Sequence, residues 1–255
     1  MSDEVRYKIK EIFSKEVIKE LYALALGVDI PDNNDKAVML SGILDREFGA
    51  GVFEELGTGT NRIAYLYTRG GFVVKIALDR RGFTDNWAEF KRSPELQTYC
   101  AKAYESNMLI LISEYVVLMT EDEFANSRNE ILTILEDISK EYIMGDVGYN
   151  KKNRCNFGYR DRSKNIVILD YGYVYPMINQ QKAMTCPRCK HPIEYTQNYD
   201  AFICTNHNCK NQYTFMDVRR RMRLDYENLE DQMISELTSL EMPDMTDVNL
   251  FNKRG

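Results

Sequence analysis

The chain has 255 residues, of which 44% are hydrophobic and 28% are charged, so it can bury a sizeable core as two compact units or as one lobed domain. Its net charge of −6 argues against wrapping duplex nucleic acid over the whole surface, although Arg219–Arg223 is a basic run. The longest apolar run, Met108–Met119, is too short and too interrupted to span a membrane, and the N-terminus is charged. We therefore expect a cytoplasmic protein with no membrane partner.

The first 50 residues are predicted to form an N-terminal helical segment. Apolar residues recur at helical spacing from Ser2 to Leu24, and Gly27 is available to end this helix. A second, shorter helix is predicted from Ala37 to Phe48. Both helices are expected to act as packing elements.

The pattern becomes β-rich after residue 51. Strands are predicted at Val52–Leu56, Ile63–Thr68, Phe72–Ala77, Met108–Ile112 and Tyr115–Leu118. A helix is predicted around Trp87–Tyr104, between the third and fourth of these strands. This order predicts a small sheet with one helix packed against it.

The next part, residues 119–184, carries a mixed pattern. We expect a helix, a Gly- and Asn-rich loop and a pair of strands, at Asp122–Tyr142, Gly145–Cys155, Asn156–Arg160 and Ile166–Leu169. The final segment, 217–255, is predicted to hold a helix from Asp217 to Glu241 and a frayed tail after Pro243.

Four of the six cysteines form two closely spaced pairs, Cys186 with Cys189 and Cys204 with Cys209. Zn²⁺ takes four soft ligands in a tetrahedron, and two residues between cysteines let one turn of the chain wrap the metal. A turn at Gln197-Asn198 predicts a hairpin that presents both pairs to one ion. Residues 185–216 therefore resemble a zinc ribbon whose metal is structural.

Some alternatives remain open for the cysteines. His207 lies between the last two of the four, so it is the alternative fourth ligand in a Cys₃His site. Cys100 and Cys155 are interpreted as small buried apolar residues, since we expect no disulfide framework in a chain without a signal peptide. Zinc ribbons also bind nucleic acid or protein, and the basic character of this one makes such a partner an expectation.

Two neighbouring features indicate a phosphate site. The segment Gly57–Arg62 lies between two predicted strands, where small residues let backbone N–H groups approach phosphates, although a plain hairpin turn is the alternative. The following strand holds Lys75 within an apolar run, and a buried lysine needs a partner. Glu89 on the next helix is our choice for that partner, Glu95 is the second choice, and a lysine that points to water is the simplest alternative.

These features, with the connecting segment Ile112–Val116, resemble the protein-kinase-like fold over about residues 51–173, half of the chain. In that family the loop covers the phosphates of ATP, the lysine holds its α- and β-phosphates, and the glutamate orients the lysine. The chain also resembles kinase-like proteins encoded by bacteriophages, which would place it in a host cytoplasm. The resemblance implies that ATP contacts Gly57, Gly59, Thr60, Arg62 and Lys75.

The resemblance continues downstream. Asp170-Tyr171-Gly172 is similar to the family's Asp-Phe-Gly element, whose Asp binds Mg²⁺, and Asp146 stands where the catalytic base is expected. The family's metal-binding Asn falls five residues after the base, where this chain has Lys151. Asn150, Asn153 and Asn156 compete for the role, and we choose Asn156 because it opens the strand pair that leads to Asp170.

The resemblance thus predicts an α+β, two-lobed protein-kinase-like fold, with an N-lobe at 51–118, a reduced C-lobe at 119–184 and the zinc ribbon after it. No His-Arg precedes Asp146, Arg62 replaces the third glycine, and no Ala-Pro-Glu follows Tyr171. Two functions follow. One is an ATP- and Mg²⁺-dependent phosphotransferase acting on a protein or small-molecule hydroxyl, and the other is a pseudokinase-type adaptor whose ribbon binds a protein or nucleic acid. Retention of Asp146 and Asp170 favours the first.

Overall fold

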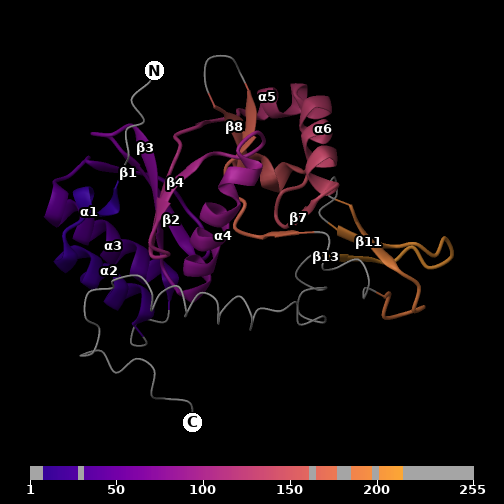
Figure 1. Cartoon of the computed structure of the whole chain (residues 1–255), viewed down its shortest axis with the longest axis horizontal. Coiled ribbons are helices and arrows are strands. Elements are labelled where there is room, and N and C mark those ends of the chain that lie inside the picture. Colours follow the sequence, from indigo (N-terminus) through magenta and orange to yellow (C-terminus); the bar gives the residue numbers. More distant parts are fainter. Residues whose placement is uncertain (1–7, 28–31, 161–164, 177–184, 197–200, 215–255) are drawn as a thin grey trace, which may run out of the picture.

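The computed structural model describes residues 8–27, 32–160, 165–176, 185–196 and 201–214. The predicted helix at 217–241, the basic run at 219–223, the frayed tail and the turn at 197–198 lie outside these residues. Within them the fold is a mixture of helices and antiparallel strands (Figure 1). No helix among the described residues is long and apolar enough to cross a membrane.

The N-terminal segment forms three helices, α1 (Ile9–Ile12), α2 (Lys15–Leu26) and α3 (Asn33–Phe48). The prediction of one continuous first helix is wrong, because Ser14 is extended and its hydroxyl accepts a hydrogen bond from Val17 N to begin α2. Gly27 ends α2 as predicted. Helix α3 begins earlier than predicted, because the Asp32 carboxylate accepts from Asn34 N and caps it.

The predicted small sheet with a helix packed against it forms, but the strand expected at Tyr115–Leu118 is not part of it, because only Val117–Leu118 is a strand and it pairs with Gly158 and Tyr159 in a separate sheet. Five antiparallel strands in the order β1-β2-β3-β5-β4 form the predicted sheet, with β1 at Phe53–Thr58, β2 at Arg62–Tyr67, β3 at Phe72–Ala77, β4 at Ala103–Ser106 and β5 at Ile110–Ser113. The packed helix, α4, occupies Arg80–Leu96 rather than Trp87–Tyr104, because the Asp79 side chain accepts from Gly82 N and starts it early. The residues after α4 form β4, an edge strand that was not predicted.

The following part alternates short helices and short strands. Its elements are β6 (Val117–Leu118), α5 (Glu121–Asn126), α6 (Arg128–Ser139), β7 (Tyr142–Met144), the 3₁₀ helix η1 (Lys151–Asn156), β8 (Phe157–Tyr159), β9 (Ile166–Ile168) and β10 (Val174–Pro176). The predicted strand pair is confirmed as β8 and β9, and β6 joins them at the edge, while β7 pairs with β10. The predicted single helix at 122–142 is wrong, since Ser127 separates α5 from α6.

The cysteine module forms a three-stranded antiparallel sheet, with β11 at Ile193–Thr196, β12 at Ala201–Cys204 and β13 at Gln212–Thr214. The hairpin of β11 and β12 is confirmed, with Ile193 opposite Cys204. The third strand was not predicted. It pairs with β12, so Cys204 at the end of β12 and Cys209 in the connection to β13 belong to one hairpin.

Of the four apolar clusters among the described residues, the three largest organise the fold. The first joins helices α1 to α3 to one side of the five-stranded sheet, and the second fills the part from Leu96 to Val174. The third surrounds the cysteines and includes Ile143 of β7. In Figure 1 the indigo helices and the orange cysteine strands lie at opposite ends of the molecule. The domain boundaries expected from the sequence stay predictions.

Candidate functional site

A cavity of about 690 Å³ lies where the five-stranded sheet meets the following part of the chain. Its walls come from the β1–β2 turn, β3, the segment after β5, and the loops that follow β7 and β9. Eight residues predicted from the sequence line it, namely Gly57, Gly59, Thr60, Arg62, Lys75, Asp146, Asn156 and Asp170. The fold thus brings together segments that the sequence separates by more than a hundred residues.

The glycine segment is a hairpin turn and also a wall of the cavity. Gly57 and Thr58 still pair with β2, and Gly59 N donates to the Arg62 carbonyl at 2.8 Å, so the strands join tightly. A Cβ on Gly59 would lie 3.3 Å from that carbonyl oxygen, a close approach that favours glycine. The turn is also held from outside, because Asn33 Nδ2 donates to the Thr60 carbonyl at 2.7 Å.

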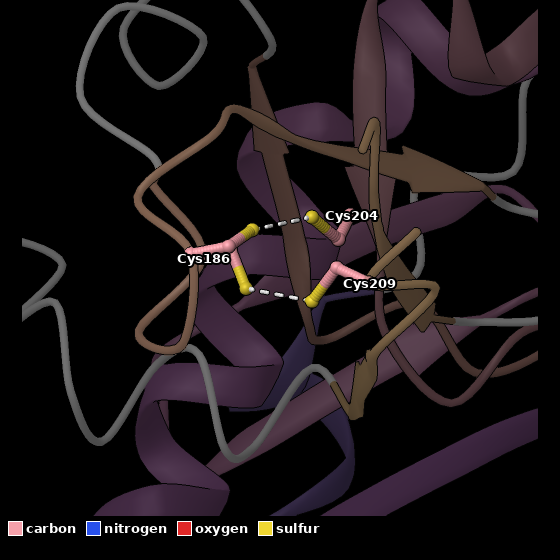
Figure 2. Close-up of side chains that lie close together, drawn as sticks. Cys186, Cys204 and Cys209 are labelled. Carbon is pink, nitrogen blue, oxygen red and sulfur yellow. Dashed lines mark hydrogen bonds between the residues drawn. The ribbon is translucent and has the colours of Figure 1, made fainter. Parts of the chain in front are cut away.

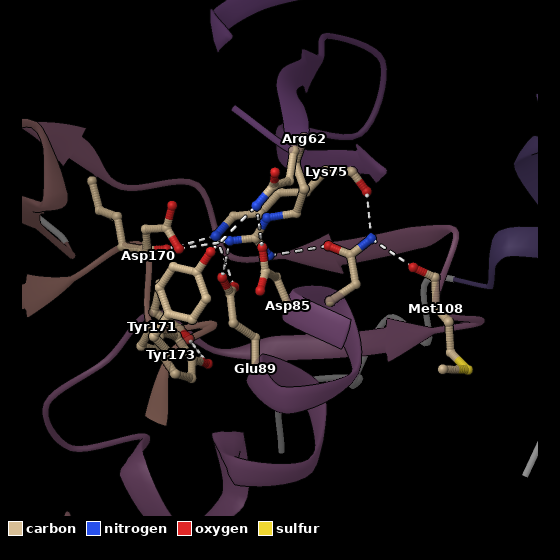
Figure 3. Close-up of polar contacts among 12 residues, drawn as sticks. Arg62, Lys75, Asp85, Glu89, Met108, Asp170, Tyr171 and Tyr173 are labelled. Carbon is tan, nitrogen blue, oxygen red and sulfur yellow. Dashed lines mark hydrogen bonds and ion pairs between the residues drawn. The ribbon is translucent and has the colours of Figure 1, made fainter. Parts of the chain in front are cut away.

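Glu89 lies at the centre of a charged network beside the cavity (Figure 3). Its side chain is 1% exposed, and its carboxylate binds Lys75 Nζ at 2.7 Å and Arg62 Nη2 at 2.7 Å. The predicted ion pair of Lys75 with Glu89 is therefore confirmed. Glu95, the alternative partner, instead binds Arg92 and the Tyr142 hydroxyl at the surface.

The network reaches across to the other wall through two contacts. Arg62 Nη2 lies 2.6 Å from Asp170 Oδ1, and Lys75 Nζ donates to the Leu169 carbonyl at 2.7 Å. Desolvation in the cleft would raise the pKa of Asp170, but the charges of Arg62 and Lys75 outweigh it and hold that pKa well below its ordinary range. Burial lowers the pKa of Arg62, but Glu89, Asp170 and Asp85 outweigh it and leave that pKa above its ordinary value. Asp170 and Arg62 therefore stay charged at neutral pH.

Asp85 is a member of this site that the sequence reasoning missed. It is 4% exposed and lines the cavity, Asn61 Nδ2 donates to its Oδ2 at 3.4 Å, and its Oδ1 has no hydrogen-bond partner among the described residues. Burial raises the pKa of Asp85 to about 6, while Arg62 opposes that rise. Asp85 stands one helical turn before Glu89, and this i to i+4 spacing is the signal that places it on the same helix face.

The loop after β7 presents Asp146 and Asn156 to the cavity. Asp146 has a left-handed backbone, with φ of +60°, which is uncommon for a residue with a side chain. Asn156 Nδ2 donates to the Asp146 carbonyl at 2.9 Å and fixes this turn. Of the competing asparagines, Asn150 caps η1 by accepting from Lys152 N and Asn153 N, and neither Asn150 nor Asn153 lines the cavity.

The four predicted cysteines form one cluster, and none of them lines this cavity. Their Sγ atoms all lie within 4.8 Å of one another, with Cys189 and Cys204 at 3.3 Å and Cys186 and Cys209 at 3.8 Å. Four sulfurs about 2.3 Å from a tetrahedral Zn²⁺ lie about 3.8 Å apart, so the cluster fits that ion. Figure 2 shows Cys186, Cys204 and Cys209 turned toward a common point.

The surroundings of the cluster agree with metal binding. The hydrogen bond with the Tyr213 hydroxyl at 3.1 Å lowers the pKa of Cys186 to about 6, whereas burial raises that of Cys204 to about 12. A bound cation would deprotonate all four thiols. The cluster forms without His207, so the geometry favours four cysteines over the Cys₃His alternative.

The two remaining cysteines differ from each other. Cys100 is buried, as predicted. Cys155 is exposed at the end of η1 and lines the cavity, so the prediction that it is buried is wrong. None of the residues of η1 is buried, and Cys155 is among the exposed residues of that helix. The sequence has no apolar periodicity there from which the helix could have been predicted.

Comparison with known proteins gives partial likeness to solved structures. A scan against protein-family models finds no match, and a search of curated proteins finds none. Among solved structures, the chain is similar to the Rio2 kinase of Chaetomium thermophilum in its ADP/Mg²⁺-phosphoaspartate complex, at 12% identity and a TM-score of 0.34. The match covers 54% of this chain and 53% of the kinase chain, so the two share likeness over about half of their lengths.

The cysteine cluster predicts one tightly held zinc per chain. Metal analysis of protein purified without added zinc should show it, and Cys186→Ser or Cys204→Ser should lose it, because a three-thiolate site has lost one of its four ligands. Cys155→Ser is the matched control and should keep its zinc, since that thiol lies outside the cluster. A metal-free parent with two disulfides would contradict the prediction.

The buried carboxyl of Asp85 predicts a pH dependence of stability. Its pKa is about 6 in the folded chain and about 4 in an unfolded one, so between these values the unfolded chain binds fewer protons. This group therefore lowers the free energy of unfolding by up to about 3 kcal/mol as the pH rises from about 4 to 6. The Asp85→Asn variant has no carboxyl at this position, so its free energy of unfolding should not fall in this way.

Urea unfolding of the parent and of Asp85→Asn at several pH values between 4 and 7 measures the effect. The stability of the variant relative to the parent should increase with pH across that window, because only the parent carries the Asp85 carboxyl. Asp122→Asn, at an exposed position of α5, is the control and should run parallel to the parent. Parallel curves for Asp85→Asn would refute the prediction.

Proposed function

We propose that this chain is an ATP- and Mg²⁺-dependent phosphotransferase with a two-lobed, protein-kinase-like arrangement, acting on a protein or small-molecule hydroxyl. The observation that carries the proposal is the convergence on one cavity of a glycine turn, the Lys75–Glu89 ion pair, Asp146, Asn156 and Asp170. A cation held by a buried glutamate below a glycine turn is suited to phosphate binding. The carboxylate and amide oxygens opposite it are the ligands that Mg²⁺ prefers.

Each group has a distinct task in this proposal. Lys75 binds phosphate oxygens and is oriented by Glu89, while Gly57, Gly59 and Thr60 approach the phosphates from the β1–β2 turn. Asp170 and Asn156 hold Mg²⁺, which when bound neutralises charge on the transferred phosphoryl group. Asp146 accepts the proton of the acceptor hydroxyl.

Arg62 gives the site a character of its own. Its guanidinium occupies the space between Glu89 and Asp170, and it carries a permanent charge. To hold Mg²⁺, Asp170 would therefore have to give up its contact with Arg62. Glu89 keeps Arg62 within reach, so the same guanidinium can then bind a phosphate oxygen.

The second candidate function is a pseudokinase-type adaptor, in which the cysteine module binds a protein or nucleic acid. The Arg62–Asp170 ion pair favours it, because the carboxylate expected to bind metal is already neutralised by a side chain. Nucleotide binding separates the two candidates, since the adaptor needs no ATP.

Thermal unfolding with and without ATP and Mg²⁺ tests the proposal. Ligand at about a hundred times its dissociation constant should add about 2.7 kcal/mol to the free energy of unfolding of the parent. Lys75→Met should remove most of this gain yet stay folded, because Glu89 still has Arg62 as a partner and methionine fills a similar volume. Lys140→Met, which changes an exposed lysine of the surface, is the control and should respond as the parent does. No response in the parent would favour the adaptor.

The two aspartates are expected to fail in different ways. Asp170→Asn should weaken Mg²⁺-dependent nucleotide binding together with turnover, because a metal ligand is lost. Asp146→Asn should keep nucleotide affinity and lose about 10²–10⁴-fold in rate, the usual contribution of a positioned general base. Phosphate transfer or ATP hydrolysis, with binding measured in parallel, decides this. Equal, metal-independent activity in both variants and the parent would exclude these roles.

A further inference from the structure

A tyrosine of the cysteine module contacts the strand that leads to the candidate catalytic loop. Tyr195 on β11 donates from its hydroxyl to the Met144 carbonyl at 2.7 Å. Met144 is the last residue of β7 and stands two residues before Asp146. The Tyr195 ring also packs on Phe202, with ring centroids 4.9 Å apart, and Phe202 is buried in the cluster that surrounds the cysteines.

Strand β7 is itself part of the cysteine core. Ile143 is 1% exposed and belongs to the same apolar cluster as Cys186 and Cys204. One face of the short strand that leads to Asp146 is therefore covered by the module. A change in the packing of the module acts directly on that strand.

Tyr173 connects the same core to the glycine turn. Its side chain packs against the cysteine cluster, and its carbonyl accepts from Gly145 N at 2.9 Å, next to Asp146. Its hydroxyl accepts from Asn61 Nδ2 at 3.3 Å, and Asn61 belongs to the turn proposed to bind phosphates. Both walls of the cavity are thus in contact with residues that pack on the module.

We propose that the cysteine module positions the candidate catalytic loop, with Tyr195 as the positioning residue, so that metal at the cysteines and nucleotide in the cavity stabilise each other. The effect of nucleotide rests on the function proposed above, whereas the positioning of the loop by Tyr195 does not. A metal ion fixes the ends of β11 and β12 through the cysteines, and the Tyr195 hydroxyl and Ile143 transmit that order to β7. Coupling between two binding sites is reciprocal. Bound nucleotide must therefore raise the affinity for the metal by the same factor by which bound metal raises the affinity for nucleotide.

The first experiment needs no nucleotide. Amide hydrogen exchange of the zinc-loaded full chain is compared for the parent, Tyr195→Phe and Tyr104→Phe. Phenylalanine keeps the ring that packs on Phe202 and removes only the hydroxyl, so exchange at Gly145 should become about 3- to 10-fold faster, the worth of one hydrogen bond. Tyr104→Phe, at an exposed position of β4 in the five-stranded sheet, which contains neither β7 nor the strands of the module, should leave exchange at Gly145 unchanged.

Zinc content is measured in the same samples. Tyr195→Phe should still hold one zinc per chain, because none of the four thiols is altered. Faster exchange at Gly145 with the zinc retained supports the positioning role. Unchanged exchange at Gly145 would overturn it.

The second experiment measures the coupling itself. Competition for zinc between the full chain and a chromophoric chelator is brought to equilibrium with and without ADP and Mg²⁺. We expect the nucleotide to raise the zinc affinity of the parent at least about 5-fold, the lower end of typical coupling between two sites, and to raise that of Tyr195→Phe by less. If nucleotide raises the thermal stability of the parent but leaves its zinc affinity unchanged, the coupling is refuted while the proposed function stands.

A parent that shows no thermal response to nucleotide would refute the proposed function, and the nucleotide half of the coupling with it. Exchange at Gly145 would then still decide whether Tyr195 positions the loop. The two failures are therefore distinguishable.

Discussion

The carboxylate of Glu89 is the constraint on which the rest of the site depends. A carboxylate that is almost completely buried is destabilising by several kcal/mol unless cations and hydrogen-bond donors surround it. Here Lys75 and Arg62 each supply one contact, from neighbouring strands, and α4 supplies the glutamate. The positions of β2, β3 and α4 are thereby fixed to one another at the wall of the cavity.

The same network crosses to the opposite wall. Lys75 also donates to the carbonyl of Leu169, and Arg62 also pairs with Asp170. Each of the two cations therefore contacts both walls of the cleft. The approach is close enough that Gly172 must lack a side chain, since a Cβ there would lie 2.7 Å from the Cβ of Asp85. The cleft is thus shaped by charge pairing on one side and by close backbone packing on the other.

The cysteine module adds a second constraint at the end of the molecule away from the N-terminal helices (Figure 1). Its small apolar cluster includes Ile143 of β7, and Tyr173, which precedes β10, packs against it. A module of this size buries little apolar surface by itself, so the apolar residues that it shares with those strands contribute to its order. The cysteine cluster and the candidate catalytic residues are consequently parts of one connected arrangement.

The sequence alone determined the features that depend on local pattern. The spacing of Cys186, Cys189, Cys204 and Cys209 predicted their cluster, the apolar run around Lys75 predicted its partner, and β3 was located at its observed bounds. Helix boundaries were less predictable, because single caps such as Ser14 and Asp79 override apolar periodicity.

Only the tertiary structure decided how residues far apart in the chain share a site. Arg62 pairs with Asp170 across 108 positions, a contact for which neither residue carries a local signal. Tertiary packing likewise buries the Asp85 carboxyl, exposes the Cys155 thiol and brings the Tyr195 hydroxyl to the strand before Asp146. Periodicity and spacing report which face of an element is buried, whereas the partner that covers that face is set by the packing of whole elements.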